Sequence, residues 1–149
     1  MTEFSPGARP ERDETPEELL AADLGLQGRR FLHLTEDRET IEIVGRVMTR
    51  RLFEAFVSPA AVASLHPEID PENARGTALG LGLSMLSGRI DRMLDTGRAI
   101  SHSDMMQVLC GTFMASREAL AAMCLGLGTR LPDVLAEARN LRWSEGPFE

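Results

Sequence analysis

The chain has 149 residues, 43% of them hydrophobic, which predicts one globular domain with a hydrophobic core. Its net charge is -7, from 23 acidic and 16 basic residues, and this excess of negative charge argues against a nucleic-acid or anionic-membrane surface. Every basic residue is arginine, and lysine and tyrosine are absent, so catalytic mechanisms that need either side chain are excluded. A bacterial-like, GC-rich coding bias is the simpler explanation of these absences.

The N-terminal segment shows no periodic hydrophobic pattern. We expect residues 1–14 to form a disordered tail, because they are mostly polar, charged, proline and glycine residues. Residues 15–18, Thr-Pro-Glu-Glu, form a capping box with proline at the first helical position, which predicts a short helix that Gly25 or Gly28 ends. A helical domain is therefore expected over residues 15–143.

The sequence predicts no membrane segment. No apolar run approaches the ~20 residues that a transmembrane helix needs. The first residues are polar and lack the apolar segment of a signal peptide. We therefore expect a cytoplasmic protein without a membrane partner.

The second predicted helix starts at Thr35 or Asp37 and is amphipathic. Apolar side chains share one face and charged side chains share the opposite face, as in an ordinary surface helix. The apolar face holds Ile41, Val44, Met48, Leu52 and Ala55, and the charged face holds Glu39, Glu42, Arg46 and Arg50. The Ser-Pro pair at residues 58–59 then predicts a short helix, which the His-Pro pair at residues 66–67 ends.

The next stretch, from Asp70 to Thr96, predicts a long helix. Asp70 is a suitable N-cap, and Pro71 suits the first helical position. Glu72 places a negative charge near the positive end of the helix dipole. An alternative is that the several glycines of this stretch break it into two shorter helices.

Two stripes along this helix predict that it lies at the centre of the fold. One stripe is large and apolar, and the other consists of residues too small to hold a neighbouring backbone away. The large stripe is Leu79, Leu83, Leu86, Ile90 and Met93, and the small stripe is Gly76, Gly80, Ser84 and Ser87. Leu81 and Met85 lie on the remaining side, so most of the helix has no wide polar face.

One further long helix is predicted from about residue 102 to about residue 127, after a Ser-x-x-Asp capping box at residues 101–104. Cys110 and Cys124 would lie on this helix about 21 Å apart, too far for a disulfide bond. A last helix is predicted over about 132–141, and residues 144–149 are expected to be flexible. The sequence thus predicts an all-α, single-domain bundle of five or six helices.

The titratable residues suggest no catalytic or metal site. His33, His66 and His102 lack a Glu or His partner three or four residues away, so the usual zinc and di-iron spacings are missing. Asp91 and Asp95 with His102 and Asp104 form the nearest candidate cluster, which solubility and helix capping explain more simply. We expect no cofactor, no metal and no enzymatic activity.

Sulfur-containing residues gather in the predicted helix over 102–127. Cys110 lies near Arg117 in this helix, which could favour a thiolate, but a cysteine is more often a small hydrophobic residue. Met105, Met106, Met114 and Met123 could form a soft-metal site or an adaptable groove. Methionine is common in helical cores, so core packing is the simpler interpretation.

The preferred hypothesis is a non-enzymatic, adaptor-like or regulatory module that contacts another protein. We expect a homodimer whose subunits meet at the small stripe, Gly76, Gly80, Ser84 and Ser87. A second surface, formed by Leu83, Met85, Phe113 and Met114, is predicted to bind the partner or a ligand. The alternative hypothesis is a helical receptor that holds a small apolar ligand between the central helix and the methionine-rich helix. A metal enzyme that uses Asp91, Asp95 and His102 is a third hypothesis.

Overall fold

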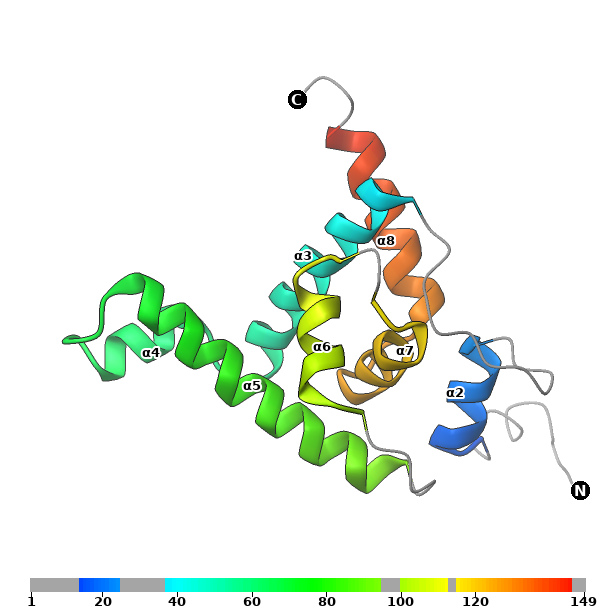
Figure 1. Cartoon of the computed structure of the whole chain (residues 1–149), viewed down its shortest axis with the longest axis horizontal. Coiled ribbons are helices and arrows are strands. Elements are labelled where there is room, and N and C mark those ends of the chain that lie inside the picture. The colour runs from blue at the N-terminus through cyan, green and yellow to red at the C-terminus, as the bar shows by residue number, and fades with distance from the viewer. Residues whose placement is uncertain (1–13, 25–36, 95–99, 113–114, 146–149) are drawn as a thin grey trace, which may run out of the picture.

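The computed structural model describes residues 14–24, 37–94, 100–112 and 115–145 (Figure 1). Within these ranges the chain forms seven helices and no strand, so the predicted all-α class is confirmed. The helices are α2 (Pro16–Leu24), α3 (Arg38–Ala55), α4 (Pro59–Leu65), α5 (Pro71–Met93), α6 (His102–Leu109), α7 (Arg117–Gly126) and α8 (Leu131–Glu145). The predicted count of five or six helices is not confirmed, and α8 extends one turn beyond its predicted end.

The capping signals in the sequence mark the starts of four helices correctly. In each case a side-chain oxygen accepts a hydrogen bond from a backbone N–H in the first helical turn. The pairs are Thr15 with Glu18, Ser58 with Ala61, Asp70 with Asn73 and Ser101 with Asp104. These starts are confirmed because a cap is a local interaction, which a few neighbouring residues determine.

The predicted continuous helix over 102–127 is wrong, because the chain turns between α6 and α7. Gly111 has a positive φ of 71°, which L side chains rarely adopt. Ser116 then caps α7 by accepting a hydrogen bond of 3.1 Å from the Ala119 N–H. Cys110 therefore lies at the end of α6 and Cys124 within α7, and both are free thiols.

Helix α7 lies in the middle of the molecule, in contact with α2, α5, α6 and α8 (Figure 1). Every residue of α7 from Ala119 to Gly126 is buried. A helix that is apolar all round is expected at such a position. The predicted central position of α5 is not confirmed, since α5 runs along one side of the molecule (Figure 1).

The first half of α5 packs against α4 to form a projection that we call the α4–α5 arm (Figure 1). The arm has a small hydrophobic cluster of its own, which consists of Val62, Ala74 and Ala78. Phe53, at the end of α3, packs partly buried against this cluster. The second half of α5 joins the main core through Leu83, Leu86 and Ile90.

Helices α7 and α8 are joined by a sharp turn. Gly128 has a φ of 82°, and its N–H donates to the Leu125 carbonyl. The two helices are bent by 100° relative to each other. No single helix in the described ranges is long and apolar enough to cross a membrane, although this bent pair meets the same criteria of length and composition together.

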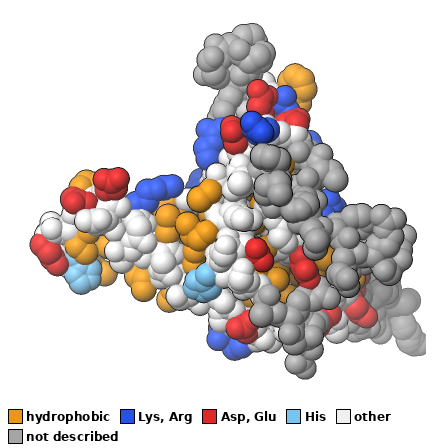
Figure 2. Space-filling model, in the orientation of Figure 1, with side chains coloured by type: hydrophobic (Ala, Val, Ile, Leu, Met, Phe, Trp, Pro, Cys, Tyr) orange, Lys and Arg blue, Asp and Glu red, His pale blue; other side chains and the backbone are white. Residues whose placement is uncertain are grey.

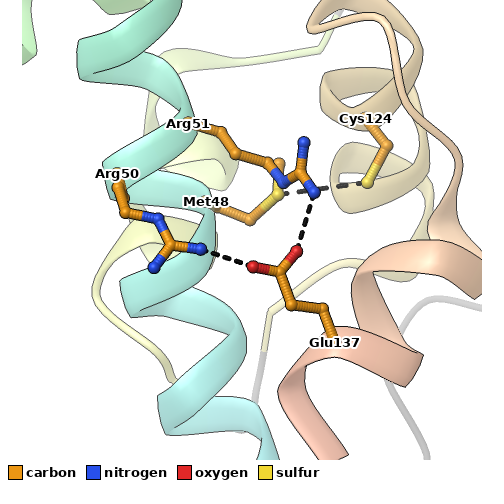
Figure 3. A network of polar contacts seen from close by, with 5 residues as sticks. All are labelled: Met48, Arg50, Arg51, Cys124 and Glu137. Atoms are coloured by element: carbon orange, nitrogen blue, oxygen red, sulfur yellow. Dashed lines mark hydrogen bonds and ion pairs between the residues drawn. The ribbon is translucent and has the colours of Figure 1, made fainter. Parts of the chain in front are cut away.

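Ion pairs join α3 to α8. Glu137 of α8 accepts hydrogen bonds from both Arg50 and Arg51 of α3, the latter at 2.7 Å (Figure 3). At the other end of the helix pair, Arg142 contacts Asp37 and Glu39. The hydrogen bond from Arg51 is the main reason why the pKa of Glu137 lies below its ordinary value of 4.5.

The lowered pKa of Glu137 predicts a loss of stability in acid. The ionised carboxylate contributes fully to stability above the unfolded-state pKa, and this contribution is lost as the pH falls through the folded-state pKa. Glu137→Gln should therefore lower the free energy of unfolding at about pH 7 by roughly 1 kcal/mol or less, because the pairs are partly exposed. At an acid pH below the lowered folded-state pKa of Glu137, the carboxyl group is protonated, and the variant and the wild type should be almost equally stable.

Urea denaturation at both pH values measures this difference. Glu54→Gln is the matched control, because Glu54 is exposed and lies on the same helix as the two arginines. The control should have the same free energy of unfolding as the wild type at both pH values. An equal loss in Glu137→Gln at both pH values would show that the carboxylate charge is not what stabilises the α3–α8 contact.

A partly buried ion pair holds α2 against the turn between α7 and α8. The Asp23 carboxylate accepts two hydrogen bonds from the Arg130 guanidinium, at 2.6 and 2.9 Å. The backbone carbonyl of Asp23 accepts a third hydrogen bond, from the Arg117 guanidinium at 3.2 Å. The Asp23 side chain is buried, whereas the Arg130 side chain is 36% exposed. This geometry raises the pKa of Arg130, chiefly through its hydrogen bond with Asp23.

Candidate functional site

Most of the predicted subunit-contact residues lie on the surface of α5. Gly76, Gly80 and Ser84 are exposed, and Ser87 is half-buried. A Cβ atom added at Gly76 or Gly80 would meet no heavy atom of the described structure within 4 Å. The small stripe therefore makes no close helix contact at these two glycines within one described chain.

Two large apolar side chains stand beside these small residues. Leu81 is 49% exposed and Met85 is 54% exposed, and they lie one helical turn apart. From Gly76 to Gly88 the sequence contains no charged residue. We call Gly76, Gly80, Leu81, Ser84 and Met85 the outer face of α5. A solvent-facing helix surface normally carries charged residues, so this face is unusually apolar.

The predicted ligand or partner surface is not brought together in the described structure. Leu83 is buried in the main core, whereas Met85 points to the exterior on the same helix. Phe113 and Met114 lie outside the described residues. Neither Leu83 nor Met85 lines the cavity described next.

A cavity of about 450 Å³ lies where the α4–α5 arm joins the rest of the molecule. Its walls come from α3, from the segment before α4, from α5 and from the end of α6. The described lining residues are Arg46, Thr49, Arg50, Phe53, Glu54, Ser58, Arg75 and Leu109. Figure 2 shows basic side chains beside hydrophobic ones on this part of the visible face.

The three arginines of the cavity differ in whether they form an ion pair. Arg50 pairs with Glu137 outside the cavity wall. Arg46 and Arg75 form no ion pair with any described residue. The Cζ atom of Arg75 lies 5.5 Å from the centroid of the Phe53 ring, within the range of a cation–π interaction. Two positive charges are therefore available beside an apolar wall.

The sequence interpretation placed Arg46 and Arg50 on a solvent face and did not identify this cavity. A signal was present, because Arg46, Arg50 and Phe53 recur at helical spacing and so share one side of α3. Arg75 belongs to a different helix. Its proximity to Phe53 depends on tertiary packing, which residue spacing does not report.

The buried sulfur atoms belong to the core. The Cys124 Sγ atom lies 4.0 Å from the Met48 Sδ atom, and both residues are fully buried (Figure 3). Burial is the main cause that raises the pKa of the Cys124 thiol, which favours the neutral, unreactive form. Met105 and Met123 are also fully buried. These contacts support core packing rather than soft-metal binding for the sulfur atoms of the four fully buried residues, Met48, Met105, Met123 and Cys124.

The described residues contain no group of three or more His, Cys, Asp or Glu side chains that could hold a metal ion. Asp91 and His102 are exposed, and Asp104 lies in the first turn of α6 behind its Ser101 cap. Asp95, the remaining member of the predicted cluster, lies outside the described residues. Arg117, suggested as an activator of Cys110, instead donates to the Asp23 carbonyl.

No protein-family model, no curated protein and no solved structure matches this chain. Two features of the described structure are candidate functional sites, the outer face of α5 and the cavity at the base of the α4–α5 arm.

Proposed function

We propose that the chain is a non-enzymatic, adaptor-like interaction module that forms a homodimer through the outer face of α5. In the dimer, the remaining helical surfaces would be free to contact a partner protein. The observation that carries this proposal is the exposure of Leu81 and Met85 on a helix surface that has no charge from Gly76 to Gly88.

The outer face of α5 places large and small exposed residues side by side. Leu81 and Met85 are large side chains that protrude into solvent, whereas Gly80 and Ser84 are small and would leave shallow depressions in the helix surface. A twofold axis would seat the protruding side chains of one copy in the depressions of the other, because both copies present the same surface. Small residues also let two helix axes approach closely.

The glycines of this face support the same interpretation. A glycine inside a helix lowers helix stability by about 1 kcal/mol relative to alanine. Within one chain nothing described compensates for this loss at Gly76 or Gly80, because no atom lies within 4 Å of an added Cβ atom. Close contact with a second chain would compensate for it.

Leu81→Arg should convert the dimer to a monomer, because it places two like charges at the centre of the twofold contact. Sedimentation equilibrium measures the change in mass. Leu65→Arg is the matched control, because Leu65 is 74% exposed and lies at the tip of the same arm, away from the outer face of α5. The control should remain dimeric.

Gly80→Leu provides a second test, since it fills a depression without adding charge. It should weaken association while the circular dichroism spectrum stays unchanged, because the single chain has space at this position. A wild-type protein that sediments as a monomer up to millimolar concentration, or a Leu81→Arg variant that stays dimeric, would contradict the proposal.

The receptor hypothesis receives support from one observation, the cavity of about 450 Å³. Pockets of this size accommodate small molecules. Its location differs from the predicted one, and its three arginines do not suit a purely apolar ligand.

A further inference from the structure

We propose that the cavity at the base of the α4–α5 arm binds a small amphipathic carboxylate, with its anionic head at Arg46 and Arg75 and its apolar body against Phe53 and Leu109. This inference does not depend on the proposed dimer, because none of the residues of the outer face of α5 lines the cavity.

The charge of the cavity walls is opposite in sign to that of the whole chain. The net charge of the protein is -7, yet three arginines and one glutamate line the cavity. Arg46 and Arg75 have no ion-pair partner among the described residues, so neither guanidinium group is already engaged by a carboxylate in that part of the chain. A carboxylate could accept paired hydrogen bonds from a guanidinium group, which is a geometry that arginine favours.

The apolar part of the wall favours a ligand with an apolar body. Phe53 is half-buried, and Leu109 is buried at the end of α6. The ring of Phe53 already contacts the Arg75 guanidinium, at 5.5 Å between the ring centroid and Cζ. A flat aromatic or short aliphatic group could therefore lie beside the ring while its carboxylate reaches the same arginine.

Glu54 favours a single negative charge on the ligand. It is the one acidic side chain among the described lining residues, and it would repel a doubly charged phosphate more than a carboxylate. The hydroxyl group of Thr49 is already engaged, since it donates to the Gly45 carbonyl at 2.8 Å. The arginines and the apolar side chains thus favour a ligand with one anionic group and an apolar body, and the volume of about 450 Å³ suits a small molecule.

Isothermal titration calorimetry with 2-naphthoate tests the proposal, and 2-naphthylmethanol serves as the uncharged comparison. We expect 2-naphthoate to bind in one saturable site and the alcohol to bind about tenfold more weakly, because the alcohol lacks the charge-assisted hydrogen bonds. Arg46→Met and Arg75→Met should each weaken binding of 2-naphthoate roughly fivefold. Phe53→Leu should weaken the binding of both compounds.

Arg92→Met is the matched control, because Arg92 is exposed, lies on α5 like Arg75 and does not line the cavity. It should change the affinity less than twofold, and the dimer variant Leu81→Arg should bind as the wild type does. Thermal denaturation verifies that each variant is folded. If Arg75→Met does not fold, Arg46→Met alone provides the test.

Four results would overturn the proposal. These are the absence of saturable binding of 2-naphthoate, equal affinity for the alcohol, an equal loss in Arg92→Met, and displacement of 2-naphthoate by equimolar inorganic phosphate. The last result would indicate a general anion site instead of a carboxylate site.

Discussion

Gly45→Ala should lower the free energy of unfolding by about 3 kcal/mol, at the upper end of the usual effect of overpacking. Gly45 lies in α3 where the helix crosses the end of α6. A Cβ atom at this position would lie 2.7 Å from the Gly111 nitrogen and 2.8 Å from the Leu109 carbonyl oxygen. Both are backbone atoms, so neither can move aside without shifting a helix.

Gly80→Ala is the matched control for this prediction, because it makes the same change in a helix that has space for the new methyl group. It should raise the stability of the monomer by about 0.5 to 1 kcal/mol through the higher helix propensity of alanine. Urea denaturation of both variants in the Leu81→Arg background separates this effect from association. Equal changes in the two variants would show that the α3–α6 contact is not tight.

Asp23→Ala should lower the free energy of unfolding by about 2 kcal/mol, as expected for the loss of one partner of a partly buried ion pair. The value is below the 3 to 5 kcal/mol of a fully buried pair because the Arg130 side chain is 36% exposed and can be hydrated again. The change also removes the carboxylate that pairs with Arg130 and so joins α2 to the turn before α8.

Thermal or urea denaturation measures this loss, and Asp91→Ala is the control with the same change of charge. Asp91 is exposed on α5, so its removal should change stability by no more than about 0.5 kcal/mol. In a double-mutant cycle, Asp23→Ala and Arg130→Met should be strongly non-additive. Additive effects would mean that the two side chains contribute independently and that their contact is not stabilising.

The sequence was sufficient for the features that local interactions determine. The caps at Ser58, Asp70 and Ser101 each involve a residue and an N–H three positions later, so their spacing alone predicts the helix starts. The all-α class follows from the same signals together with the absence of strand-like alternation.

The break between α6 and α7 was not predictable in the same way. The positive φ of Gly111 and its contact with the Glu42 backbone depend on α3, which lies far away in sequence. Ser116 lies inside the continuous helix that the sequence predicts over 102–127, yet it caps α7. Apolar residues recur at helical spacing both before and after the break. The pattern is therefore typical of one continuous helix and does not indicate the turn.

The predicted central position of α5 is not confirmed, because small residues are ambiguous. Gly76, Gly80 and Ser84 suit a close helix contact, but they also tolerate exposure, and in the single chain they are exposed. In contrast, α7 combines alanine with large residues such as Leu120 and Met123, all fully buried. Residue size alone could not distinguish a helix inside the fold from one with an exposed face.

The buried cluster of the α4–α5 arm is much smaller than the main core, which predicts that the arm can unfold separately. Only Val62, Ala74 and Ala78 form its own buried cluster, whereas the main core gathers side chains from six helices. So small a cluster can open in a local fluctuation that leaves the main core intact. Phe53 and Arg75 lie where the arm joins the rest of the molecule. A molecule bound between them would therefore reduce local opening of the arm.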